Sequence, residues 1–269
     1  MKKILLASIA VVGLWANGAE RFAGDEGILR IAGGTAHIPV MKIVASEITK
    51  VAPKLKIAIA GGGSGVGIKK VGEGLVDIGN AGRKASDKEI AKYGLVLHKW
   101  AIDGIAVVLN NKNNITDMNQ SQIQDVFAGK ITNWRELGGE DKAITVYTRD
   151  KASGTRKVFW KKVLNKGDIT SKALFINSNG AMKRSIENDT ASIGFMSAGF
   201  VDSSLHAVAI DGVAPTKENI QKGVYSYSRG LYSITKGEPK GTAKKFIEYL
   251  LTPHVQHDIV AQKGFIPVK

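Results

Sequence analysis

The first hundred residues alternate between two hydrophobic patterns. Short β-branched runs over 28–32, 55–60 and 76–81 have the pattern of buried strands. The segments between them, 39–51 and 66–75, carry apolar residues at the three-to-four-residue spacing of a helix. Strands and helices that alternate at this spacing predict parallel βαβ units and therefore an α/β fold.

A helix start and a long apolar run follow. Ser86 and, three residues later, Glu89 form a capping-box pattern, which predicts a helix that reaches Tyr93. The next run, 95–111, is apolar except around Asp103 and the glycine after it, and is too long for one average strand. We expect two strands there, which meet at a crossing between domains.

A second alternating set completes the pattern. Its expected elements are a helix over 120–127, a strand over 143–148, a helix over 153–164, strands near 193 and 208, a strand over 231–235, and helices over 242–251 and 253–263. Two α/β sets joined by a crossing predict two lobes with a cleft between them. In such sheets, ligands lie at the carboxyl ends of the strands, where helices begin.

Composition and charge narrow the range of binding partners that we expect. The chain has 269 residues, 43% of them hydrophobic and 23% charged, as in an ordinary soluble globular protein. A net charge of +14 fits nucleic acid, an anionic surface or a small anionic ligand. The basic residues are scattered in pairs along helix faces rather than in long runs, so we expect no nucleic acid partner.

The beginning of the chain indicates export. Two lysines, an apolar run from Ile4 to Trp15 and small residues up to Ala19 are typical of a secretory signal peptide, too short in its apolar part to span a bilayer. We expect residues 1–19 to be cleaved, with an uncleaved anchor as the alternative. The chain has no cysteine, which excludes a disulfide framework and a lipid-modified cysteine. These features fit the periplasm.

Three strand-to-helix loops share one character. They read "AGGTAHIPV", "AGGGSGVGI" and "TRDKASGTRKV", each with glycine and a Ser or Thr directly before a helix. The first N–H groups of a helix lack internal partners and carry partial positive charge, and glycine lets a ligand approach them. If the loops converge, they form a cage of donors for a compact anion. One such loop alone is usually just a helix cap.

The third loop carries the stronger signal. Arg149 stands four residues ahead of Ser153, Gly154 and Thr155, and a helix cap does not require an arginine there. A guanidinium offers a planar fork that suits two oxygens of phosphate. None of the loops is a P-loop, because the Gly-Lys-Ser/Thr ending is missing.

No catalytic or metal site is expected. Ser153 has no obvious histidine partner, and His254 and His257 have no third ligand nearby. We therefore expect no cofactor, no metal and no enzymatic activity. The rival from another class is an exported phosphate-ester hydrolase that uses the same loops.

The order of motifs resembles a known family. "IAGGTAHIP", "AGGGSGVGIKKVGEGLVDIGNAGR", "FAGKITNWRELGG", "TRDKASGTR" and "ASIGFMSAGF" together resemble the phosphate-binding protein of bacterial ABC phosphate importers (PstS-like) over nearly the whole mature chain. The resemblance implies a type II periplasmic-binding-protein fold, a Venus flytrap with two crossover strands. It also implies a monomer that hands phosphate to a membrane permease. The lobes are expected over 27–103 with 229–269, and over 104–228.

The resemblance also implies site residues. Carried over position by position, the phosphate contacts are Thr35, the Ala36 backbone, Ser64, Arg149, Ser153, Gly154 and Thr155.

One position departs from the family. Well-known members place a carboxylate after the "VDIG" strand, where it accepts the proton of phosphate and rejects sulfate, but this chain has Gly82 and Arg83 there. We expect Asp103 to supply the acceptor, with Asp77 as a weaker candidate and a simple turn aspartate as the alternative reading of Asp103. Arg83 is expected to be a second cation on the anion, or else part of a surface salt bridge. Sulfate, molybdate and phosphonate remain rival ligands.

Overall fold

The computed structural model describes residues 18–269. Its strands are β1 Gly27–Gly33, β2 Leu55–Gly62, β3 Ile78–Ala81, β4 Leu95–Asn110, β5 Asp117–Met118, β6 Thr145–Arg149, β7 Leu174–Ile176, β8 Ser192–Ser197, β9 Leu205–Ala207, β10 Ala209–Ile210, β11 Ser228–Lys236 and β12 Ile266–Pro267. Its α-helices are α1 Ile38–Val51, α2 Gly63–Gly72, α3 Asp87–Tyr93, α4 Gln120–Ala128, α5 Gly154–Lys162, α6 Asn179–Asn188, α7 Lys217–Gln221 and α8 Gly241–Leu250. Short helical turns add η1 Ala19–Phe22, η2 Thr35–His37, η3 Trp134–Leu137, η4 Ala198–Phe200 and the π-helical η5 Val255–Val260.

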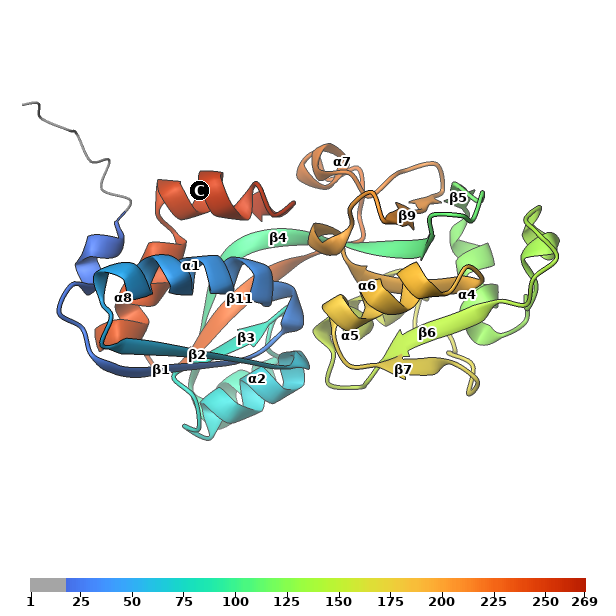
Figure 1. Ribbon diagram of the computed structural model, residues 1–269. Helices are drawn as coiled ribbons and strands as arrows, with labels where there is room; N and C mark the ends of the chain where they lie inside the picture. The colour runs from blue at the N-terminus through green and yellow to red at the C-terminus, as the bar shows by residue number, and fades with distance from the viewer. Residues whose placement is uncertain (1–17) are drawn as a thin grey trace, which may run out of the picture.

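One sheet runs through the molecule in the order β2-β1-β3-β11-β4-β8-β6-β7. β1 pairs in parallel with β2 and β3 at one end, and β6 pairs in parallel with β7 and β8 at the other. The crossing strands β11 and β4 are antiparallel to their neighbours. Helices cover the two ends of the sheet as separate groups, one around α1, α2 and α8 and the other around α4 to α6 (Figure 1).

The long apolar run corrects the expectation of two strands. β4 is one uninterrupted strand of 16 residues, with Asp103 and Gly104 inside it. Its first half pairs with β11 and its second half with β8, so both halves have ladder partners and no break is needed. β4 therefore passes from one group of helices to the other (Figure 1).

Buried apolar side chains gather separately on the two sides of this crossing. One cluster includes Trp100 and Phe246 and draws on residues before 102 and after 230. The other is built around Phe159, whose ring stacks on Phe195 at 4.0 Å between centroids, with Phe127 at an edge. Each side thus has a core of its own, as separate packed layers of an α/β protein require. The lobe boundaries given above stay a prediction.

One helix start differs from the sequence expectation in a way that matters for the site. The capping box of Ser86 and Glu89 is present as predicted. α2 begins at Gly63 rather than near 66, because Gly62 and Gly63 both adopt positive φ and turn the chain early. Ser64 therefore lies in the first helical turn instead of a loop.

Other elements were missed or changed, α6 and the last helix among them. α6 was not predicted from the sequence; it begins after Ser178, whose hydroxyl accepts the Ala181 N–H as an N-cap. Near the end of the chain, η5 replaces the α-helix expected over 253–263. No helix within residues 18–269 has the length and apolar character needed to cross a bilayer. Most of the expected signal peptide, residues 1–17, lies outside the described residues.

Candidate functional site

The three glycine-bearing loops meet at one small cavity. Its lining comprises Gly34, Thr35, Ala36, Gly63, Ser64, Gly82, Arg149, Ser153, Gly154, Thr155 and Arg229. The structure therefore brings together the seven residues that the resemblance assigned to phosphate. It also adds Arg229 to them and leaves Arg83 and Asp103 outside the lining.

Three helix beginnings line this cavity. Thr35 opens η2, which continues into α1, and Ser64 lies in the first turn of α2. Gly154 and Thr155 open α5, with Ser153 as its N-cap. The N–H groups in these first turns have no partner inside their helices, and the helix dipoles favour negative charge there. A compact anion is the ligand that this arrangement suits.

The first turns of α2 and α5 are in direct contact. The Gly65 N–H donates to the Ala152 carbonyl at 2.9 Å. A Cβ at Gly154 would lie 2.0 Å from the Ser64 hydroxyl oxygen, and one at Gly63 would lie 2.8 Å from the Ala152 oxygen. Only glycine at these positions allows the two helix ends to come this close.

Arg149 is buried in the cavity wall without enough partners. Arg149 is 1% exposed, and its Nη2 donates to the Asn177 carbonyl at 3.1 Å. Nε and Nη1 have no hydrogen-bond partner among the described residues. Burial lowers the pKa of Arg149 to about 10, and the charge of Arg229 acts in the same direction, whereas Asp150 opposes it. The guanidinium remains charged at neutral pH.

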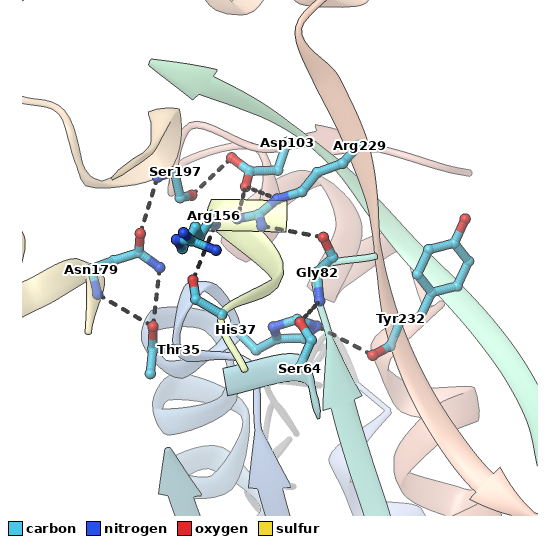
Figure 2. Close-up of polar contacts among 11 residues, drawn as sticks. Thr35, His37, Ser64, Gly82, Asp103, Arg156, Asn179, Ser197, Arg229 and Tyr232 are labelled. Atoms are coloured by element: carbon cyan, nitrogen blue, oxygen red, sulfur yellow. Dashed lines mark hydrogen bonds and ion pairs between the residues drawn. The ribbon is translucent and has the colours of Figure 1, made fainter. Parts of the chain in front are cut away.

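Arg229 and Asp103 form a buried ion pair beside the cavity. They face each other across β11 and β4, and Arg229 Nε and Nη2 donate to the same Asp103 oxygen at 2.9 and 2.8 Å. The other Asp103 oxygen accepts from the Ser197 hydroxyl at 2.8 Å (Figure 2). Burial raises the pKa of the Asp103 carboxyl, and Arg229 and Ser197 oppose that shift. Arg229 Nη1 donates to the Gly82 carbonyl at 3.2 Å.

The hydroxyl groups of the cavity are oriented by the protein. The Thr35 oxygen accepts from the Asn179 N–H at 3.2 Å and from its Nδ2 at 3.1 Å (Figure 2). The Ser64 oxygen accepts from the Gly82 N–H at 2.9 Å, and the Ser153 oxygen accepts from a backbone N–H of α5 at 3.1 Å. Each hydroxyl group therefore still has its own proton to donate to another acceptor, such as a ligand.

Comparison with known proteins places the chain in a family. Residues 20–254 match the PBP superfamily domain. The phosphate-binding protein PstS of Bacillus subtilis is 36% identical over 255 residues, which cover 94% of this chain and 84% of that protein. A crystal structure from Clostridium perfringens, described as a phosphate ABC transporter substrate-binding protein with bound phosphate, superimposes with a TM-score of 0.84 at 36% identity, over 90% of this chain and all of that one. An ABC-type phosphate transport receptor from Vibrio cholerae is 31% identical, with a TM-score of 0.71 over 88% of this chain and 99% of that chain.

The chain belongs to the PstS family of phosphate-binding proteins. The two-lobed α/β fold expected from the sequence is thereby confirmed. These relatives are named as binding proteins or receptors, in keeping with the expectation of a protein without enzymatic activity.

Two candidates that were considered where the chain departs from the PstS pattern lie elsewhere in the structure. Arg83 donates through Nη1 and Nη2 to the two carboxylate oxygens of Glu89, at 2.8 and 2.7 Å, and so takes the salt-bridge alternative. An Asp77 oxygen accepts the backbone N–H of Arg30 at 2.6 Å. Neither side chain lines the cavity.

Two residues of this PstS-type site were missed in the sequence. Asn179 lies at the start of α6, a helix that the periodicity did not reveal, and Arg229 is the second residue of β11, away from the three strand-to-helix loops. A signal for Arg229 existed, because a basic residue next to a buried crossing strand needs a buried partner, and Asp103 is the aspartate of the other crossing strand.

His37, in the first loop, lies behind the cavity rather than in it. It is fully buried, its Nε2 lies 3.2 Å from the Tyr232 carbonyl, and its ring packs edge-on against Trp100. Burial lowers the pKa of His37 to about 3, helped by the charge of Arg229. The ring is therefore neutral at physiological pH and adds no charge to the site.

Proposed function

We propose that the chain captures inorganic phosphate with high affinity in the cavity between its two lobes and delivers it to the permease of an ABC phosphate importer. The names of its relatives support this ligand. The cavity supports it independently, since its lining combines backbone N–H groups, hydroxyls and two guanidinium groups.

One observation carries the proposal: the buried Arg149 guanidinium has N–H groups without a partner. Buried polar groups in native proteins are almost always hydrogen-bonded, and a buried charge needs a counter-charge. Asp150, the carboxylate whose charge acts on Arg149, makes no hydrogen bond to it and accepts the N–H groups of Ala152 and Ser153 instead. Asp103 is occupied by Arg229 and Ser197. A bound anion supplies both the acceptors and the negative charge.

The binding step replaces water by protein donors. Phosphate oxygens would take hydrogen bonds from the first turns of α2 and α5, from the hydroxyls of Thr35, Ser64 and Ser153, and from Arg149. These bonds strengthen in a closed site from which water is excluded. The chain performs no chemistry on the ligand, and closure of the lobes holds the anion in place.

The same proposal includes the lobe boundaries, the export of the chain and its partner at the membrane. The lobes extend over 27–103 with 229–269, and over 104–228, with β4 and β11 as the crossovers. A signal peptide over 1–19 directs the chain to the periplasm, where it works as a monomer and its closed form is recognised by the permease subunits at the inner membrane.

Calorimetric titration with phosphate tests this function. The purified protein should bind one phosphate, and Arg149→Ala should weaken binding at least about 100-fold, because charge-assisted bonds to a desolvated anion are lost. Arg135→Ala is the control, since Arg135 pairs with Asp141 on the surface. Unchanged affinity in Arg149→Ala would refute the assignment of Arg149. Turnover of a chromogenic phosphate ester would favour the hydrolase instead.

A further inference from the structure

A guanidinium occupies the space next to Gly82. A Cβ built at Gly82 would lie 2.7 Å from Arg229 Nη1 and 2.9 Å from its Cζ. Arg229 and a side chain at position 82 therefore exclude each other. The family resemblance had implied an acceptor carboxylate in this region of the chain. This wall of the cavity instead presents a hydrogen-bond donor, Arg229.

No other carboxylate replaces the missing acceptor. Among the described residues that line the cavity, none is acidic. Asp103 is the nearest candidate, but one of its oxygens takes two bonds from Arg229 and the other takes the Ser197 proton. The Gly82 carbonyl already accepts one bond, from Arg229 Nη1. Asp103 thus neutralises Arg229 rather than meeting a ligand.

Hydroxyl oxygens are the remaining side-chain acceptors. A hydroxyl has one proton and two lone pairs. Both lone pairs of Thr35 accept from Asn179, so Thr35 can only donate to a ligand. Ser64 accepts one bond, from the Gly82 N–H, and Ser153 likewise accepts one. A serine with a free lone pair can accept the proton of phosphate, or rotate and donate to an unprotonated oxygen.

We propose that this cavity takes fully ionised tetrahedral oxyanions, sulfate above all, as well as protonated phosphate, because a rotatable hydroxyl and Arg229 stand where a fixed acceptor carboxylate would reject them. The inference rests on the proposed phosphate site and defines its ligand class. A buried carboxylate facing sulfate would leave two acceptors without a proton between them, which is the arrangement that gives selectivity of about 10⁴ or more. A hydroxyl removes that repulsion.

The pH dependence of phosphate binding follows from the same arrangement. Phosphate exchanges its second proton near neutral pH, and a cage with few acceptors prefers the form with fewer protons. Phosphate should therefore bind more tightly as the pH rises from 6 to 8. The charged groups facing the cavity or directly behind it are Arg149, Arg229, Asp103 and Asp150, with the neutral His37 beyond them. Sulfate, which loses no proton in this range, separates the ligand's titration from that of the protein.

The test is a pair of calorimetric titrations on the purified wild-type protein, with phosphate and with sulfate, at pH 6, 7 and 8. We expect sulfate to displace phosphate, with a Kd within about 100-fold of the phosphate value, the factor that a single imperfect hydrogen bond produces. The sulfate Kd should be the same at all three pH values. Phosphate binding that resists a thousandfold excess of sulfate would overturn the inference and leave the proposed function intact. Absence of phosphate binding would overturn the proposed function itself.

A redesigned site gives the converse test. The triple variant Gly82→Asp, Arg229→Ser and Asp103→Asn removes the ion pair together and places a carboxylate in the space that Arg229 filled. This variant should keep its phosphate affinity, and its sulfate affinity should fall at least 100-fold. Arg83→Ala, outside the cavity, should change neither affinity. Sulfate binding retained in a folded triple variant would contradict the role given to position 82. If the variant does not fold, the wild-type titrations still decide the question.

Discussion

Thr35 and Asn179, 144 residues apart in the chain, are joined by two hydrogen bonds that both end on the Thr35 hydroxyl oxygen. The Asn179 side-chain oxygen in turn accepts the Ser197 N–H at 3.2 Å. Asn179 thereby links η2 to the beginning of α6 and fixes the direction of the Thr35 proton. The bond pattern makes Asn179 a positioning residue of the closed site.

Replacement of Asn179 by alanine should weaken phosphate binding about 10-fold, since its side-chain bonds to Thr35 and to the Ser197 N–H, worth about 1 kcal/mol each, are lost. The backbone bond from Asn179 to Thr35 remains. Asn188→Ala is the matched control on the same helix, because its side chain donates only to the Arg184 carbonyl at the surface. Calorimetry on both variants makes the comparison. Equal affinities in the two variants would show that the link to Thr35 has no part in binding.

Gly154→Ala should interfere with closure of the site. The added methyl would meet the Ser64 hydroxyl at 2.0 Å, and overpacking of this kind costs about 1–3 kcal/mol, so phosphate affinity should fall about 10- to 100-fold. If the lobes open without phosphate and separate residues 64 and 154, thermal unfolding of the phosphate-free protein should change little. Gly180→Ala, whose methyl would have its nearest neighbour at 3.9 Å, should bind like the wild type. A Gly154→Ala protein with full affinity would contradict the packing argument.

Asp103→Ala should destabilise the fold itself. It leaves the buried Arg229 charge without its carboxylate, and removal of one partner of a buried pair costs about 3–5 kcal/mol. Urea unfolding measures the loss. Lys222→Ala, which breaks an exposed pair with Glu218, should cost less than about 1 kcal/mol. Similar losses in both variants would mean that burial of the Asp103 pair contributes nothing.

The Arg83–Glu89 pair should make stability depend on pH in the acid range. The hydrogen bonds from Arg83 lower the pKa of Glu89 to about 2 in the folded protein, from an ordinary value of 4.5. A lowered folded-state pKa contributes stability above the unfolded pKa and loses it as the pH falls through the folded one. The difference in unfolding free energy between wild type and Glu89→Gln should therefore shrink between pH 5 and pH 2. Glutamine keeps the capping box, so a difference that stays constant with pH would exclude the ion pair as its source.

Much of the fold followed from the sequence because its local signals agree with its packing. The spacing of apolar residues over 28–60 and the Ser86–Glu89 box are local features, and both appear in the structure. The single strand β4 was misjudged because its length depends on partners at both ends, β11 and β8, which the pattern of one segment does not reveal.

The candidate site divides in the same way. Glycine and hydroxyl residues at helix starts could be found in the sequence, since their chemistry depends on local backbone geometry. Local patterns of this kind did not point to Arg229 and Asn179, because each acts through a partner more than a hundred residues away, Asp103 and Thr35 respectively. The position of Arg83 was decided by Glu89, six residues on, which accepts hydrogen bonds from both of its terminal nitrogens, Nη1 and Nη2.

The pairing of Arg229 with Asp103 across β11 and β4 has a consequence for the order of events. Both residues belong to the crossing strands, so we expect their pairing to be kept when the angle between the lobes changes. An arriving anion would therefore meet this preformed, charge-neutral ion pair first. It would contact Arg149 only when the two lobes close. Capture should thus divide into a diffusive arrival that added salt slows and a subsequent sealing step that salt hardly alters.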